Sequence, residues 1–479
     1  MRRLPGGLLA AVVACVCVRP APADDRPNIV LMLADDQGWN GLSVEMAPGV
    51  AGSRGDAFHT PCLETFAAQG MRFSCAYAPA PVCSPTRISL QTGRSPAALH
   101  WTKAAPPERG HRLLEPTNIR DLSAADRTIG DVLRDAGYAT AHYGKWHIGG
   151  GGPGRHGYDE HDGDTGNDNA FQFTDPNPVD IFGMAERAEA FMARSSRAGK
   201  PFFVQLSWNA LHASENALRA TLAKYRQKFG DGNDKRVTTA AITEDLDIGV
   251  GRVLEAIDRL GLAGTTYVIY TSDNGSGGGG GRGRAGGGRP TGLSGGKGSV
   301  WEGGVRVPFI VRGPRVAANS WCHVPIIGYD LFPTFCEWAR VAPRSLPKSL
   351  EGGSIAGLVA GDPQARVARP REELVFHFPH YQTGNTPHSA IRLGNLKLIR
   401  FYEDDSVRLF DLDADPGERD DLAGRQPADA ARLRTRLEAY LAAVDAQTPV
   451  PNPQYSPDRA PAPPDRGGKR GTRKPRSGS

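Results

Sequence analysis

Two acidic motifs follow strand-like runs of the chain directly and could hold a metal ion. Asp35-Asp36 comes after the apolar run 28–34, and Ser272-Asp273-Asn274-Gly275 comes after the run 266–271. Two buried carboxylates repel each other and lose hydration, and both effects are unfavourable unless a cation between them compensates the charge. Oxygen ligands without a soft donor suit a hard cation, Ca²⁺ or Mg²⁺, rather than zinc. Each motif alone is also typical of a turn after a strand, so the predicted metal ligands, Asp35, Asp36, Asp273 and Asn274, depend on both motifs together.

A third motif, Cys83-Ser84-Pro85-Thr86-Arg87, combines a thiol with an arginine. Proline suits the first position of a helix and serine suits its cap, so Cys83 should lie at a helix N-terminus. Amide dipoles at such a terminus favour a bound anion. A buried structural thiol is the ordinary explanation of a lone cysteine, and it remains the alternative when Cys83 is considered alone. The motif therefore predicts an anion site at position 83.

The elements that position these motifs alternate between strand and helix through the first two-thirds of the chain. This alternation predicts an α/β fold, a large mostly parallel sheet sandwiched by helices. Short strands close in sequence then favour a smaller C-terminal antiparallel sheet plus one helix. In such folds, sites gather beyond the carboxyl ends of the parallel strands, where both acidic motifs lie. The expected strands are 28–34, 139–143, 201–208, 266–271, 307–312, 374–378, 389–393, 397–401 and 408–411, and the expected helices are 60–69, 128–136, 185–195, 237–260, 330–341 and 427–444.

Length, composition and charge divide the chain into four parts. The 479 residues are 39% hydrophobic and 23% charged, which is enough for a sizeable core. We expect a large α/β domain over 24–345, a small α+β subdomain over 346–450, and a disordered basic tail rich in proline and glycine over 451–479. The formal net charge of +5 combines +5 in this tail and +3 in residues 1–23 with −3 in residues 24–450, so a basic nucleic-acid-binding body is not supported.

Residues 1–23 have the pattern of a secretory signal peptide. Arg2 and Arg3 precede the apolar run 7–18, and Ala21-Pro22-Ala23 provides a cleavage site. We expect a periplasmic or secreted protein; a lipid anchor on Cys15 is the alternative. No later segment is apolar enough to predict an integral membrane span.

Five cysteines remain after the signal peptide, which is an odd number. If Cys83 is set apart, the other four could form disulfides in three pairings or remain buried thiols. Both alternatives stay open for Cys62, Cys75, Cys322 and Cys336.

Together with Thr92-Gly93-Arg94, the Cys-x-Pro-x-Arg motif resembles the signature of the formylglycine-dependent sulfatases, within the alkaline phosphatase-like superfamily. The resemblance extends over most of residues 27–422. Ser214 replaces the proline that usually comes two residues after the family's middle histidine. The further matching segments are Arg26-Pro27-Asn28-Ile29-Val30 with Asp35-Asp36-Gln37-Gly38, Gly144-Lys145-Trp146-His147, Leu211-His212-Ala213, the segment 296–304 with Lys297, and Leu409-Phe410-Asp411-Leu412 with Asp415-Pro416-Gly417-Glu418.

The resemblance implies an exported sulfuric ester hydrolase, similar to arylsulfatases and carbohydrate sulfatases. A formylglycine-generating or sulfatase-maturing enzyme would convert Cys83 to 3-oxoalanine (formylglycine), whose hydrate is the nucleophile. Ca²⁺ would be held by the four acidic-motif ligands and would contact residue 83. Arg87 and Lys145 would hold the hydrate, His212 or Lys297 would protonate the leaving alcohol, and His147 would act as the base that releases sulfate. The substrate would be a sulfated carbohydrate or an aryl sulfate.

Two other functions remain open at this point. A phosphatase or phosphonate monoester hydrolase could use the same kind of site, because phosphoryl and sulfuryl groups have similar shapes. A chain with unmodified Cys83 could instead be a non-catalytic, metal-stabilised glycan-binding protein.

Two polar segments resemble known motifs that they do not match. The glycine-rich segment 275–298 lacks the residues of a phosphate-binding loop, since Thr291 and Gly298 stand where glycine and Ser/Thr are required. The acidic residues between 159 and 168 lack the spacing of a calcium loop, and we expect a polar loop near the substrate entrance. We expect the loops 99–116, 150–180 and 275–295 to line the substrate pocket.

Overall fold

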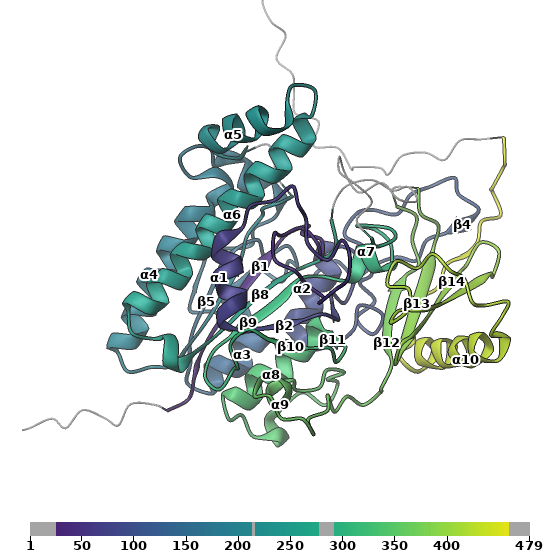
Figure 1. Cartoon of the computed structure of the whole chain (residues 1–479). Helices are drawn as coiled ribbons and strands as arrows, with labels where there is room; N and C mark the ends of the chain where they lie inside the picture. The colour runs from purple at the N-terminus through teal and green to yellow at the C-terminus, as the bar shows by residue number, and fades with distance from the viewer. Residues whose placement is uncertain (1–24, 213–215, 277–291, 383, 459–479) are drawn as a thin grey trace, which may run out of the picture.

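Eight strands form one large sheet in the order β10-β2-β9-β8-β1-β7-β5-β6. The computed structural model of the protein describes residues 25–458, apart from 213–215, 277–291 and 383 (Figure 1). The five strands from β8 to β6 are parallel, and β9 runs antiparallel to both β8 and β2. The strands are β1 (Asn28–Ala34), β2 (Met71–Phe73), β5 (Ala139–Gly144), β6 (Glu160–His161), β7 (Phe202–Ser207), β8 (Thr266–Ser272), β9 (Phe309–Arg312) and β10 (Ser320–Cys322).

Helices cover both faces of this sheet, as the α/β pattern predicts (Figure 1). Every residue of the central strands β1, β7 and β8 is buried, as expected for parallel strands covered on both sides. The apolar side chains form two core clusters, one on each face of the sheet. One face packs α1 (Pro61–Gln69), α4 (Ile181–Arg197), α5 (Arg219–Phe229) and α6 (Asp234–Arg259); the other packs α2 (Cys83–Thr92), α3 (Ile129–Asp135), α8 (Leu331–Trp338) and α9 (Ala356–Val359).

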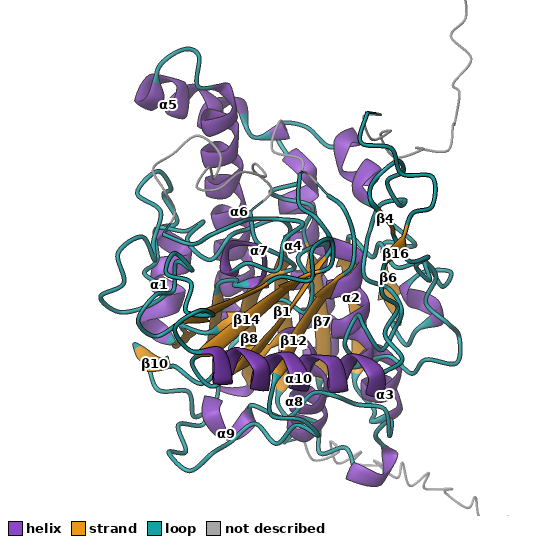
Figure 2. Ribbon diagram, turned by 90° about the vertical axis from the view of Figure 1, so that its right-hand side faces the viewer, coloured by secondary structure: helices purple, strands orange, loops and turns teal. Residues whose placement is uncertain are grey.

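A second, four-stranded sheet follows in the C-terminal part and is antiparallel throughout, as predicted. Helix α10 (Pro427–Ala443) lies along one face of this sheet (Figure 2). Leu433 and Leu437 of α10 pack there against Val375, Ile391 and Leu398. The strands are β12 (Leu374–Phe378), β13 (His388–Leu393), β14 (Leu396–Phe401) and β15 (Val407–Asp411).

Several elements differ from the sequence-based expectations for local reasons. Helix α5 was not expected, because only Thr221 and Tyr225 of its residues are buried and it has no apolar stripe. Helix α4 begins at Ile181 rather than at residue 185. The remaining elements are short: β3 (Ala76–Tyr77) pairs with β11 (Ile326–Ile327), β4 (Leu113–Leu114) pairs with β16 (Val450–Pro451), and α7 (Glu302–Val305) follows the glycine-rich segment.

The ends of the predicted domains also differ from the observed packing. Helix α9 follows the boundary expected after residue 345, yet it packs with α8 in the core of the large sheet. Pro451 is paired in β16, and the chain is described as far as Asp458, so the segment expected to be disordered from residue 451 starts with ordered structure. The predicted signal peptide, residues 277–291 of the glycine-rich segment and the tail from residue 459 lie outside the described residues.

The five cysteines of the described chain are all free thiols, so none of the disulfide pairings considered from the sequence is present. Among the described helices, none is long and apolar enough to cross a membrane.

A buried charge network joins the C-terminal sheet to α7 and β3. Lys397 of β14 lies 2.8 Å from a carboxylate oxygen of Glu302 and 2.8 Å from one of Glu418, and all three side chains are fully buried. The backbone N–H of Glu302 donates to the second carboxylate oxygen of Glu418 at 2.7 Å, and Tyr77 donates its hydroxyl to Glu302. The network holds the start of α7, and with it the preceding segment that carries Lys297, against the C-terminal sheet.

We expect Lys397→Met to lower the free energy of unfolding by about 3–5 kcal/mol, because it leaves two buried carboxylates short of a cation. Denaturant titration of both proteins measures this difference. Lys224→Met is the matched control: Lys224 pairs with Glu244 at 2.7 Å but its side chain is 49% exposed, so it should cost less than about 1 kcal/mol. Equal losses in the two variants would contradict a stabilising role for the buried network.

Candidate active site

The two acidic motifs meet because their strands are neighbours in the sheet. Ala34 of β1 is in register with Ser272 of β8, so Asp35 and Asp273 follow at the same edge. The backbone N–H of Asp36 donates to Asp273 at 3.2 Å, and Asp36 adopts a left-handed conformation with φ 61°. This turn brings both carboxylates of the first motif to the side of the second. Ligand atoms of Asp35, Asp36, Asp273 and Cys83 all lie within 4.8 Å of one another.

Cys83 is the first residue of α2 and points its thiol at the acidic cluster. Its Sγ lies 3.4 Å from Asp35 Oδ1 and 3.9 Å from Asp36 Oδ1, and the residue is only 2% exposed. The expected helix N-terminus is therefore present, but the expected cap is wrong: the N-cap is Val82, in an extended conformation, and Ser84 and Pro85 lie inside the first turn. Proline is tolerated there because the N–H groups of a first turn need no partner within the helix.

Three cations surround the acidic cluster. Arg87, one turn into α2, lies 2.7 Å from Asp273 and donates to the backbone oxygen of Lys145 at 2.7 Å. Lys145 Nζ lies 2.5 Å from Asp35 Oδ2, at the end of β5. Lys297 Nζ lies 2.5 Å from Asp36 Oδ1 and 3.3 Å from Cys83 Sγ. Because the side chains of Lys297 and Asp36 are 19% and 11% exposed whereas Lys145 and Arg87 are buried, the cluster opens to solvent beside Lys297.

Burial and these charges set the protonation of the cluster. Burial alone would raise the pKa of Asp35, but Lys145 and Arg87 hold it well below its usual range. Burial raises the pKa of Asp273 to about 6, and the charge of Asp35 adds to the shift. Burial also raises the pKa of the Cys83 thiol, as do Asp273 and Asp35, so the unmodified side chain is a neutral thiol. A neutral thiol is a poor nucleophile, and Cys83 as encoded is not activated for attack.

The donor set of this cluster fits a divalent cation. Asn274 Nδ2 donates to Asp36 Oδ1 at 2.8 Å, whereas Asn274 Oδ1 is buried and accepts no hydrogen bond from any described residue. A buried amide oxygen without a partner beside three carboxylates is the arrangement expected of an oxygen ligand for Ca²⁺ or Mg²⁺. Asp35, Asp36 and Asp273 balance the three surrounding cations, so a divalent ion would make the site positive, as binding an anionic ester requires.

Two histidines complete the site. His147, with φ 61°, donates its backbone N–H to Thr165 at 2.8 Å, and its Nδ1 lies 3.3 Å from Ser84 Oγ. Burial, together with the charges of Lys145 and Arg87, lowers the pKa of His147 to about 3, so the ring is neutral. His212 follows β7; its Nδ1 is buried and has no hydrogen-bond partner among the described residues.

The structure thus gathers every predicted site residue at one sheet edge. His212 is held there by backbone bonds between Asp35 N and Ala210 O at 2.8 Å and between Leu211 N and Asp35 O at 2.6 Å. Sequence reasoning missed the contact of Ser84 with His147 and the support of His147 by Thr165, which no motif spacing reveals. Ala213 and Ser214, which follow His212, lie outside the described residues.

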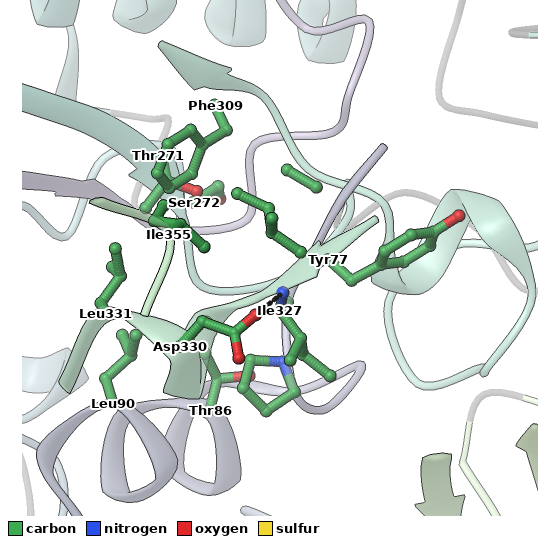
Figure 3. Close-up of a pocket in the computed structure, with 15 residues that line it drawn as sticks. Tyr77, Thr86, Leu90, Thr271, Ser272, Phe309, Ile327, Asp330, Leu331 and Ile355 are labelled. Carbon is green, nitrogen blue, oxygen red and sulfur yellow. Dashed lines mark hydrogen bonds between the residues drawn. The ribbon is translucent and has the colours of Figure 1, made fainter. Parts of the chain in front are cut away.

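Two cavities lie near this site, and they differ in volume and therefore in what they can hold. A cavity of about 10 Å³ lies behind α2, between Thr86, Leu90 and the end of β8 (Figure 3). It has room for one water molecule at most and cannot take a substrate. A cavity of about 300 Å³ lies beyond the ends of β5 and β7. Most of its lining residues belong to the loop 150–180, which was expected to line the substrate pocket.

Comparisons with known proteins agree with this geometry. The family model for sulfatases matches residues 27–341, and the model "N-sulphoglucosamine sulphohydrolase, C-terminal" matches residues 296–447. Human arylsulfatase A is 28% identical over 92% of this chain and 92% of its own length. The N-acetylgalactosamine-6-sulfatase of Sus scrofa is 30% identical over 81% of this chain and 74% of its own length.

A solved structure similar to this chain, that of Ps i-CgsB, shows the shared fold. It has a TM-score of 0.71 and 23% identity, and the alignment covers 90% of this chain and 94% of that one. The matched family region contains β1, β5, β7, β8 and α2, the elements that carry Asp35, Lys145, His212, Asp273 and Cys83. The chain belongs to the sulfatase family and is a sulfuric ester hydrolase.

Proposed function

We propose that this protein is an exported sulfatase that hydrolyses sulfate esters of a carbohydrate through a formylglycine made from Cys83 and a bound Ca²⁺. The observation that carries the proposal is the position of Cys83 at the first residue of α2, with its Sγ 3.4 Å from Asp35 and 3.3 Å from Lys297. The secretory pattern of residues 1–23 supports export to the periplasm or the medium.

The metal would be held by Asp35, Asp36, Asp273 and Asn274, with residue 83 beside it. When bound, Ca²⁺ supplies a Lewis acid that withdraws charge from the sulfate oxygens and orients the ester. The unpartnered Oδ1 of Asn274 supports its place in the ligand set. Arg87 keeps Asp273 ionised and in place through two hydrogen bonds of 2.7 and 3.1 Å to one carboxylate oxygen.

Hydration of the formylglycine aldehyde supplies two hydroxyl groups on one carbon, which neither the encoded thiol nor a serine offers. One of them can attack sulfur, and ionisation of the other can later break the bond to sulfate. Arg87 and Lys145 hold positive charge at this position and stabilise the attacking oxygen. His147, neutral because its pKa is low, can remove the proton from the second hydroxyl.

His212 or Lys297 donates the proton to the leaving alcohol. Lys297 lies at the open side of the cluster, and its ammonium is 3.3 Å from the atom that the nucleophilic group replaces. Burial alone would lower the pKa of Lys297, but Asp36 and its neighbours raise it well above the usual value, so the residue carries its proton in the resting site. His212 is half-buried after the end of β7, and burial lowers its pKa while the charge of Asp35 acts in the opposite direction.

The substrate class follows from relatives rather than from the cluster itself. The name of one 30% identical relative specifies the 6-sulfate of N-acetylgalactosamine, and the family model of the C-terminal part takes its name from N-sulphoglucosamine. Both names describe sulfated sugars, so a sulfated carbohydrate is the proposed substrate, with aryl sulfates as small substitutes.

Peptide mass spectrometry of the purified protein tests the proposal. Conversion of Cys83 to 3-oxoalanine should lower the mass of its peptide by about 18 Da. The peptide that contains Cys336 in the same digest is the internal control and should keep its thiol mass. Turnover of p-nitrophenyl sulfate should exceed that of p-nitrophenyl phosphate. Hydrolysis by a protein with unmodified Cys83 would rule out the formylglycine, and an unmodified, inactive protein would support a glycan-binding role.

A further inference from the structure

We infer that the cavity beyond β5 and β7 is a subsite for a neutral, unsulfated sugar ring of the substrate; this inference rests on the proposed function. The cavity measures about 300 Å³, at the lower end of the range for small-molecule sites. Its wall contains Thr165, Asn169, Gln172, Phe173, Arg187 and Asn209.

Two residues of the cavity wall, Thr165 and Asn209, accept hydrogen bonds from the backbone N–H groups of the active-site histidines. A Cβ atom built on Gly166 would lie 3.7 Å from His147 Cδ2, and Asn209 Nδ2 donates to the oxygen of Gly166 at 3.3 Å. The backbone oxygen of Asn209 accepts from the N–H of His212 at 2.8 Å. The cavity therefore adjoins the active site, and we expect it to hold the sugar unit next to the one that carries the ester.

The lining matches the two faces of a sugar ring. Phe173 is half-buried and, with Val179 and Met184, gives the cavity an apolar side that suits the C–H face of a pyranose. Gln172 is exposed, and its side-chain amide makes no hydrogen bond in the described part of the chain, so it is free to bind hydroxyl groups. An apolar wall with a few convergent polar groups is typical of ligand sites.

The charge of the cavity selects against a sulfated ring. Among the described residues that line the cavity, Arg187 is the single cation, and it is shared by two carboxylates, Asp162 at 2.8 Å and Asp180 at 2.5 Å. One negative charge therefore remains uncompensated on the wall. A sulfate group placed beside it would be repelled, whereas hydroxyl groups can donate to the carboxylates. The substrate sugar that follows the cleaved ester is thus unsulfated.

Kinetics with a small and an extended substrate test the subsite. The small substrate is p-nitrophenyl sulfate, and the extended one is a synthetic tetrasaccharide in which 6-sulfated N-acetylgalactosamine is linked to neutral, unsulfated hexoses. In the double variant Gln172→Ala/Phe173→Ala, the ratio of kcat/KM for the tetrasaccharide to kcat/KM for p-nitrophenyl sulfate should fall at least about tenfold, since one aromatic contact and one hydrogen bond are lost. Phe171→Ala is the matched control, because Phe171 is 48% exposed in the same segment and does not line the cavity.

The outcomes separate this inference from the proposed function. An unchanged ratio in the double variant, or an equal fall in Phe171→Ala, would overturn the subsite. Turnover of p-nitrophenyl sulfate without turnover of the tetrasaccharide by the wild type would also overturn it, while sulfate ester hydrolysis would stand. If the wild type cleaves neither, the proposed function fails. Calorimetric titration of Cys83→Ala with the desulfated tetrasaccharide then tests the subsite by binding alone. Affinity that falls about tenfold when Gln172→Ala/Phe173→Ala is combined with Cys83→Ala supports the subsite, and absence of binding overturns it.

Discussion

Replacing Cys83 with alanine should lower kcat for p-nitrophenyl sulfate by at least about 10⁴-fold, the scale of loss when a covalent nucleophile is removed. The remaining groups of the site still bind and polarise the ester, but nothing is left at position 83 to attack sulfur. Stability should change little, because the side chain contacts charged groups of the site and contributes little apolar packing. Initial rates together with thermal unfolding of wild type and variant measure both effects.

Cys336→Ala provides the control for loss of a buried sulfur. Cys336 lies in α8, is 1% exposed, and belongs to the core of the large sheet rather than to the site. This variant should keep kcat within about twofold and lose about 1–2 kcal/mol of stability through the small cavity that it leaves. Activity retained in Cys83→Ala, or lost equally in Cys336→Ala, would refute the covalent scheme.

The acidic motifs were predictable because strand ends in a parallel sheet coincide. Once 28–34 and 266–271 are recognised as strands, Asp35 and Asp273 must lie at the same edge if the strands are parallel, and the register of β1 with β8 places them side by side. The motif around Cys83 was predictable as a helix start for the same local reason, since proline can occupy only the first turn.

The exact start of α2 depends on a neighbour that the motif does not encode. Ser84 has the residue type of a cap, but the helix begins at Cys83, and Ser84 Oγ lies instead 3.3 Å from Nδ1 of His147. His147 follows a different strand, so tertiary contact decides the use of this hydroxyl. A single sequence contains no signal for that contact.

The orientation of strand β9 and the packing of the C-terminal part were beyond sequence reasoning for a similar reason. The run 307–312 is apolar and reads as a buried strand, but only its pairing with β2 and β8 makes it antiparallel. The sequence places Lys397 in an expected strand and Glu418 in a segment that resembles the sulfatase family, and neither pattern indicates that their side chains meet. They are fully buried because Glu302 of α7, almost a hundred residues earlier than Lys397, completes their network. The C-terminal sheet is thereby part of the support of the segment that carries Lys297.

Removal of the metal should abolish activity reversibly. Dialysis against EGTA should lower the rate at least about 100-fold, because the Lewis acid that offsets sulfate charge is lost. The melting temperature should fall by a few degrees, since an ion that binds only the folded chain stabilises it in proportion to its saturation. Added Ca²⁺ should restore the rate at a lower concentration than Mg²⁺, because flexible carboxylate and amide oxygens suit the larger ion. A rate that survives EGTA would exclude the metal from catalysis.

Asp273→Asn should raise the Ca²⁺ concentration needed for half-maximal rate and lower the maximal rate, each by about 10–100-fold, because one charged ligand becomes neutral. Asp330→Asn is the matched control: Asp330 is as fully buried as Asp273 and pairs with Arg369 at 2.6 Å, as Asp273 pairs with Arg87 at 2.7 Å. Its other partners are the backbone N–H groups of Ile327 and Gly353 rather than residues of the acidic cluster. Both variants lose a buried ion pair and should lose stability. Only Asp273→Asn should shift the Ca²⁺ dependence, because only there does the lost charge face the other carboxylates. A shift of equal size in Asp330→Asn would mean that the effect comes from general loosening of the fold, and Asp273 would then leave the ligand set.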